Sequence, residues 1–256
     1  MLHTTREWVL ALACLTLMLA SSEVGFRVGR KPGKQISDST KSQISTVEAG
    51  ILGVLAMLLG FTVSMAVTRF EARKQLVLEE ANAIATAYLR AQMLPLAECT
   101  DIADLLREYA NIRVPRDDGL DIYEQTVAAR QESARLQGAF WQRAVAFGQK
   151  DPIRAGALLQ SLNEVISIDE ARWTAFENHV PETVIYVIAV VGSLAMMIVG
   201  YTFGLGGLRQ LFSICTLSVA ISLVLVVIID LDRPHEGFIH VSQQPLVDLQ
   251  KRLHRQ

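Results

Sequence analysis

The residues best suited to metal chemistry lie together near the carboxyl end of the chain: Asp230, Asp232, His235, Glu236 and His240. Carboxylate and imidazole groups are common ligands of divalent metals, so this group could bind a cation weakly. The five histidines of the chain, however, include no HExxH pair and no other close ligand spacing. Solvated polar residues after the end of a helix explain the group better, and we expect no metal site.

Five further polar residues lie on otherwise apolar stretches with helical spacing: Glu79, Glu80, Asn82, Asn163 and Glu164. They could form a binding site, or they could lie on the surface and in buried hydrogen bonds, which is the interpretation we favour. The sequence contains no GxSxG motif, no Walker motif and no reactive Cys–His arrangement. We therefore expect no enzyme activity and no cofactor.

Charge and cysteine content exclude other classes of protein. The formal net charge is only −2, without the basic surface that nucleic-acid binding requires. The three cysteines, Cys14, Cys99 and Cys215, form no CxxC pair. They indicate neither a disulfide framework nor a zinc site.

The elements that must position these residues begin with four long uncharged stretches, at 8–22, 49–68, 183–208 and 211–229. Twenty residues of helix, such as 49–68, span about 30 Å, which is the hydrocarbon thickness of a bilayer. The sequence therefore predicts an integral, multi-pass membrane protein. The first stretch is short and could be a cleaved signal peptide, but we favour a short first transmembrane helix that ends near Phe26.

The predicted fold is an all-α membrane protein with four transmembrane helices and a soluble helical bundle inserted between helices two and three. The expected segments are a first transmembrane helix or signal anchor (1–26), a polar loop (27–46), a second transmembrane helix (47–68), the soluble helical domain (69–182), a transmembrane hairpin (183–230) and a tail with a short amphipathic helix (231–256).

The soluble segment is helical in pattern. Apolar residues recur at i, i+3, i+4 and i+7, for example from Ile102 to Ile112, and prolines interrupt the pattern at Pro95, Pro115 and Pro152. The segment carries 13 Lys and Arg and 18 Asp and Glu, a net charge of −5. Such a charge is typical of a helical bundle with a solvated acidic surface.

The carboxyl tail carries one apolar stripe, formed by Leu246, Leu249 and Leu253. A helix with such a stripe can pack on the soluble helices, or it can lie at the membrane surface. The sequence leaves both open.

The second transmembrane helix has two distinct faces. Small residues form one face, and larger ones form the other: Gly53, Ala56, Gly60, Ser64 and Thr68 against Leu55, Leu58, Thr62, Met65 and Arg69. In lipid, small residues normally let helices approach closely, so packing is the better interpretation of the first face. Either face could instead line a pore if several copies surround an axis.

Two segments of the chain resemble a known family. The segment from Leu58 to Arg90 reads LLGFTVSMAVTRFEARKQLVLEEANAIATAYLR, and the segment from Leu231 to Leu246 reads LDRPHEGFIHVSQQPL. Both resemble the bacterial bestrophin-like membrane proteins. More distantly, Gly60-Phe61, Ala66 and the run from Arg69 to Lys74 resemble the signature of the bestrophin ion channels, although Phe70 stands where two aromatics are expected and Ala72 replaces a glycine.

The bestrophin resemblance implies a function. Bestrophins are pentameric ion channels of which the helix before the signature lines the pore, and their helical domain is cytoplasmic. The residues that this implies are pore-lining candidates (Leu55, Leu58, Phe61, Thr62 and Met65) and a charged pore mouth (Arg69, Glu71, Arg73 and Lys74). A ring of apolar side chains would gate by dewetting, and a charged ring would bias the sign of the ion.

The expected location is the bacterial inner membrane, with the lipid bilayer, inorganic ions and further copies of the chain, five in a bestrophin, as partners. An even number of crossings places both termini and the helical domain on one side. Five basic residues flank the membrane on that side and six on the other, so charge leans slightly against a cytoplasmic domain, whereas the resemblance favours one.

Two other functions compete with the channel. A membrane-anchored helical sensor or scaffold without transport activity would also need a bundle between transmembrane helices. A small-molecule transporter has less support, because the sequence shows no charge inside a membrane span and no pair of broken helices.

Overall fold

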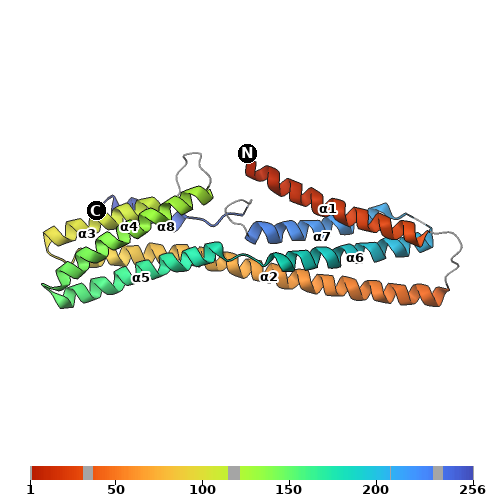
Figure 1. The fold of residues 1–256 in the computed structure, drawn as a ribbon, viewed down its shortest axis with the longest axis horizontal. Coiled ribbons are helices and arrows are strands. Elements are labelled where there is room, and N and C mark those ends of the chain that lie inside the picture. Colours follow the sequence, from red (N-terminus) through yellow and green to blue (C-terminus); the bar gives the residue numbers. More distant parts are fainter. Residues whose placement is uncertain (1, 31–36, 115–121, 208, 233–238, 256) are drawn as a thin grey trace. The chain divides into compact units, whose positions relative to one another are not determined.

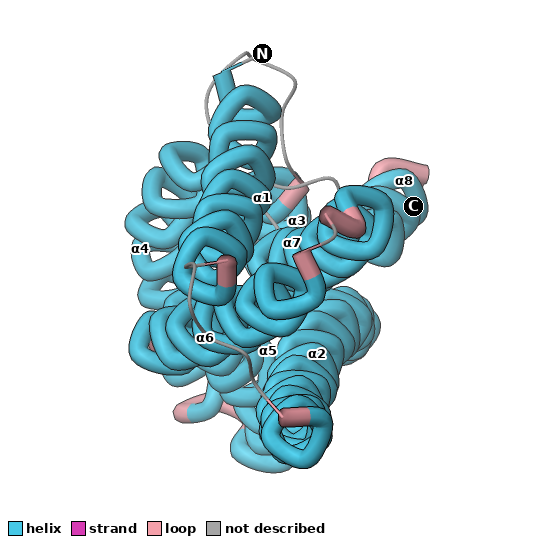
Figure 2. The backbone as a smooth tube through the Cα atoms, turned by 90° about the vertical axis from the view of Figure 1, so that its right-hand side faces the viewer, coloured by secondary structure: helices cyan, strands magenta, loops and turns pink. Residues whose placement is uncertain are grey.

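The computed structural model describes residues 2–30, 37–114, 122–207, 209–232 and 239–255, without the side chains of 2–8, 10, 96–98 and 122–124. The described residues form helices and no strand (Figures 1 and 2). The helices are α1 (Leu2–Gly29), α2 (Asp38–Ala91), α3 (Leu96–Arg113), α4 (Ile122–Gly148), α5 (Pro152–Glu177), α6 (Glu182–Gly206), α7 (Leu211–Asp232) and α8 (Gln244–Leu253). The all-α prediction is therefore confirmed.

Four helical stretches within the described residues are long and apolar enough to cross a membrane, and they involve α1, α2, α6 and α7. They agree with the four uncharged stretches of the sequence. Helix α2 continues unbroken through the charged run at residues 69–74 and contains 54 residues, about 80 Å of helix. No proline occurs within it, so its backbone hydrogen bonds continue from apolar to charged sequence.

The chain divides into two compact units, and the boundary falls within α2 after Phe70. Unit 1 contains residues 1–70 and 179–240, and unit 2 contains residues 71–178 and 241–256.

Unit 1 is held together by a close approach of α1 and α6. A Cβ added at Gly200 would lie 1.9 Å from the carbonyl oxygen of Ser22, and one added at Gly25 would lie 1.9 Å from that of Met197. Gly29 and Gly204 extend the same contact by one turn, so each helix contributes a GxxxG pair. Only glycine permits backbones to come this close. Dispersion and Cα–H···O interactions stabilise the contact.

Among the described residues of unit 1, no other helix contacts the small-residue face of α2 at Gly53 or Gly60. An added Cβ at Gly53 or Gly60 would find no atom within 4 Å. The packing expected for this face is therefore not made at these glycines by the part of the protomer that the structure describes. The opposite face of α2 packs instead, through Leu55 and Ala66.

Unit 2 is a bundle around an apolar core shared by the second part of α2 and by α3, α4, α5 and α8. Tyr109 and Phe140 are fully buried and meet edge to face, with ring centroids 6.1 Å apart. The three leucines of the tail, Leu246, Leu249 and Leu253, are part of this core. Of the two positions that the sequence left open for the tail, the structure therefore shows packing on the bundle.

Local chemistry sets several helix ends. Asp151 caps α5 by accepting a hydrogen bond from the Arg154 amide at 3.1 Å, and Pro152 occupies the first turn, where no amide donor is needed. Helix α6 ends at Gly206, and its C-cap residue, Gly207, has a φ of 69°. The left-handed conformation at this position favours glycine. The predicted break at Pro115 lies outside the described residues.

Candidate functional site

The most unusual surface of unit 1 is the uncovered face of α2. Met57 is 54% exposed, Phe61 67% and Met65 39%, although all three are apolar. They lie at intervals of four residues, on about the same side of the helix, and Gly60 and Ser64 are exposed beside them. No described element of the protomer covers this face, so it is available to lipid or to another copy of the chain.

The predicted pore-lining residues divide between this face and the interior of the protomer. Leu55 and Thr62 are buried, at 2% and 3% exposure. Leu58 is half-buried and packs against the apolar cluster that contains Leu55. Phe61 and Met65 are exposed. Thr62 follows Leu55 by seven positions, about two helical turns, which is why these two share one covered side.

The predicted pore-mouth residues have different surroundings. Arg73 is buried at 7% exposure, and its guanidinium donates to the carbonyl oxygens of Ala175 and Asn178, both at 2.9 Å. These carbonyls end α5 and lack partners within the helix, so Arg73 acts as a helix cap. Arg73 thus has a structural role in the protomer, and its place at a pore mouth stays a prediction.

The other three pore-mouth residues are more accessible. Glu71 and Lys74 form an exposed ion pair at 3.5 Å. Arg69 is half-buried, and its Nη1 atom is buried without a hydrogen-bond partner among the described residues. A buried guanidinium nitrogen without a partner is costly, which singles out Arg69 within the signature.

Glu80 lies at the centre of a buried ion network in unit 2. Its carboxylate is fully buried and forms ion pairs with Arg113 of α3, at 2.7 Å, and with Arg172 of α5. Tyr109 donates a hydrogen bond to it at 3.2 Å. Arg113 also pairs with Asp169, at 2.9 Å. Four charged side chains from three helices therefore neutralise one another inside the bundle.

The two acids of this network respond differently to their surroundings. Burial alone would raise the pKa of Glu80, but attraction to Arg172 and Arg113 outweighs it, and the pKa lies below its ordinary value. For Asp169, burial prevails over attraction to Arg113, and the pKa is raised. The arginines therefore outweigh the cost of burying the Glu80 carboxylate, whereas they offset only part of that cost for Asp169.

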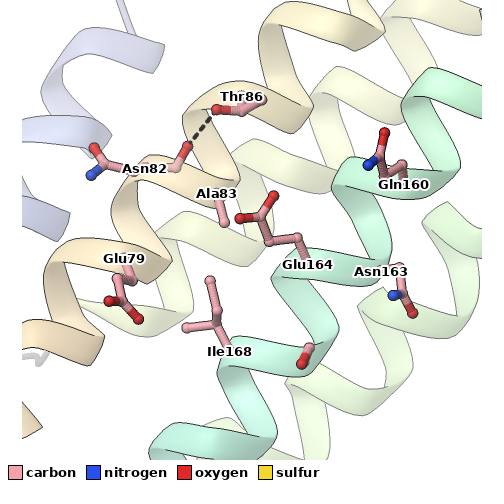
Figure 3. Close-up of a pocket in the computed structure, with 9 residues that line it drawn as sticks. Glu79, Asn82, Ala83, Thr86, Gln160, Asn163, Glu164 and Ile168 are labelled. Atoms are coloured by element: carbon pink, nitrogen blue, oxygen red, sulfur yellow. Dashed lines mark hydrogen bonds between the residues drawn. The ribbon is translucent and has the colours of Figure 1, made fainter. Parts of the chain in front are cut away.

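The other four polar candidates line one groove of about 700 Å³ between α2 and α5 (Figure 3). The two helices run antiparallel here, because Arg73 contacts Ala175 and Arg90 donates to the carbonyl of Ala157. The residues that line the groove are Glu79, Asn82, Ala83, Thr86, Gln160, Asn163, Glu164, Ser167 and Ile168. The structure therefore separates Glu80, which is buried, from the remaining candidates, which share a groove.

The two acidic residues at the end of α7, Asp230 and Asp232, accept hydrogen bonds from backbone amides. The Asp232 carboxylate accepts from the Val180 amide at 2.9 and 3.0 Å, and Asp230 accepts from the Ile239 amide at 3.1 Å. His235 and Glu236 lie outside the described residues. Within the described part of the chain, no three His, Cys, Asp or Glu residues are arranged to hold a metal ion.

Sequence reasoning missed two features. The GxxxG pairs of α1 and α6 were visible in the sequence, but the small-residue stripe of α2 drew attention instead. The partners of Glu80 had no comparable signal, because Arg113 and Arg172 are 33 and 92 residues away from it along the chain.

Comparison with known proteins agrees with this architecture. A bacterial bestrophin homologue from Klebsiella pneumoniae, in a variant with one substitution, has a similar structure, with 13% identity, 98% coverage of both chains and a TM-score of 0.66. Another structure of that homologue has 14% identity, covers 96% of this chain and 95% of its own, and gives a TM-score of 0.64. A structure described as a membrane protein has 14% identity, coverage of 98% and 96%, and a TM-score of 0.65. These similarities concern the fold.

No curated protein matches the sequence. The family described as "Bestrophin-like domain" matches residues 15–246, which is most of the chain. The protein therefore belongs to the bestrophin-like family.

Proposed function

We propose that this membrane protein is a homo-oligomeric ion channel and that the uncovered face of α2 lines its pathway. The observation that carries the proposal is the exposure of Met57, Phe61 and Met65 along an otherwise transmembrane helix. Copies of α2 around a common axis would cover the flanks of this face. Its centre would remain open to ions.

The side chains of this face suit a gate. Phe61 is its largest exposed side chain, and Met57 lies one turn before it. Apolar rings of this kind close a narrow pore by dewetting, without a charged barrier. The small residues Gly53, Gly60 and Ser64 would keep the remaining pathway wide. Leu55 and Thr62 support the helix from inside the protomer.

The charged run after the apolar stretch has a divided role in this proposal. Arg69, Glu71 and Lys74 form the mouth of the pathway and bias the sign of the ion. Arg73 positions them by capping α5. Membership of the bestrophin-like family supports five subunits, an inner bacterial membrane and a cytoplasmic unit 2.

The test is ion flux through the purified protein in liposomes. Phe61→Ala should raise the flux severalfold, because it widens an apolar constriction. Phe212→Ala is a matched control: Phe212 is 84% exposed at the start of α7, and the variant should conduct like the wild type. Leu55→Ala should lower the thermal stability instead. An intact oligomer that passes no ions would contradict the channel.

A sensor or scaffold is the second candidate, and the polar groove of unit 2 is the observation that favours it. The two functions differ in the liposome experiment. A folded protein without flux, even as Phe61→Ala, would favour the sensor. Neither function requires catalysis.

A further inference from the structure

We propose that the groove between α2 and α5 binds a linear polyamine, that is, a flexible chain of methylene groups with protonated amines. The proposal goes beyond ion conduction and does not depend on it. All residues that line the groove belong to unit 2.

The charge of the groove favours a cation. Glu79 and Glu164 lie on opposite helices, and no Lys or Arg is among the lining residues. Glu79 accepts one hydrogen bond, from the neutral amide of Gln75 at 3.1 Å, and Glu164 has no partner among the described residues. By contrast, the neighbouring carboxylates Glu80 and Asp169 both pair with arginine. Each of these two carboxylates lacks a paired cation, so each can attract one ammonium group of a ligand.

The floor and rim of the groove favour an organic cation. Ala83 is 4% exposed, Ile168 packs against the core, and Figure 3 shows both pointing into the space between the helices. They offer an apolar surface on which methylene groups can lie. The amides of Asn82, Gln160 and Asn163 on the lining supply carbonyl oxygens that can accept hydrogen bonds from further amines.

A single metal ion fits less well. A volume of about 700 Å³ is far larger than one ion needs, and it lies within the range of small-molecule sites. The two carboxylates come from different helices, and the described residues hold no group of three acidic, His or Cys ligands. The shape and charge therefore match an extended cation with separated charges.

The test is isothermal titration of spermidine into the full-length protein in detergent at low salt. Glu79→Gln with Glu164→Gln should weaken binding about tenfold or more, because two charge-assisted contacts are lost. The matched control is Glu108→Gln with Glu132→Gln, which removes the same charge from exposed ion pairs elsewhere in unit 2. The control should bind like the wild type.

Two further measurements complete the test. Ser167→Arg places a cation at an exposed position of the groove and should abolish binding while the helical circular dichroism stays unchanged. Propylamine, with a single charge, should bind about tenfold more weakly than spermidine. Equal losses in the groove and control variants, equal binding of propylamine, or displacement of spermidine by equimolar Mg²⁺ would each overturn the proposal.

Discussion

The α1–α6 contact of unit 1 and the Glu80 network of unit 2 hold helices together by opposite means. In unit 1, Gly25 and Gly200 bring two backbones together with no side chain between them. In unit 2, Glu80 and its two arginines fill the space between helices with charged side chains. The first contact contains no charged group, and the second is made of charged groups.

The difference follows from the surroundings that we propose for the two units, lipid for unit 1 and water for unit 2. In lipid there is little hydrophobic drive between helices, so association depends on close packing, for which glycine is best suited. In water, burial of leucines and aromatics supplies the drive, and the resulting core can contain charges if every charge is paired. Helix α2 takes part in both: it buries Leu55 and Ala66 in unit 1, and Val77 and Glu80 in unit 2.

The largest effect is expected from Glu80→Gln. The variant removes the main counter-charge of Arg113, whose side chain is 9% exposed, and of the half-buried Arg172. Breaking a buried pair in this way costs about 3–5 kcal/mol. Thermal unfolding of the full-length protein in detergent, followed by circular dichroism, should show a much lower midpoint.

Glu79→Gln is the control for this prediction, because the neighbouring carboxylate is exposed and forms no ion pair within the described residues. Its effect should stay within about 0.5 kcal/mol. Equal stability of the two variants would show that the buried network does not hold unit 2 together.

The next effect concerns the backbone contact of unit 1. In Gly200→Ala, the added methyl group would lie 1.9 Å from the Ser22 carbonyl oxygen, so α1 and α6 must separate. Overpacking of this kind costs about 1–3 kcal/mol, measured as the same unfolding midpoint. Gly53→Ala adds the same methyl group where no atom lies within 4 Å, and it should leave the midpoint unchanged. A loss in both variants would point to a general intolerance of α2 and α6 rather than to this contact.

The sequence predicted the features that depend on local pattern. The four apolar stretches follow from length and charge alone, and the continuity of α2 follows from the absence of proline between residues 49 and 91. The cap at Asp151 and the glycine after α6 at Gly207 were not among the predictions, although both also depend on local sequence. Each of these depends on neighbours within a few turns of helix.

The features that depend on tertiary contacts were harder to predict. Which face of α2 is covered depends on where α1, α6 and α7 lie, so Leu55 and Thr62 could not be separated from Phe61 by sequence. The same holds for Arg73, whose role as a cap depends on where α5 ends. Glu80 and Glu79 are adjacent and identical in type, yet one is fully buried and the other exposed.

The smallest effect is a pH dependence of the unfolding free energy, which we expect for a variant in unit 2 but not for one in unit 1. The raised pKa of Asp169 means that the folded protein binds this proton more tightly than the unfolded chain, so the contribution of Asp169 to the unfolding free energy falls as pH rises above about 4. Asp169→Asn removes this loss. The variant should be more stable than the wild type by only about 1 kcal/mol, and this difference should grow as the pH rises above about 4. The lowered pKa of Glu80 acts in the opposite direction, but at lower pH. The effect of Gly200→Ala should not change over the same range, because no titrating group takes part in that contact. A pH-independent difference for Asp169→Asn would show that burial of this carboxylate is fully compensated by Arg113.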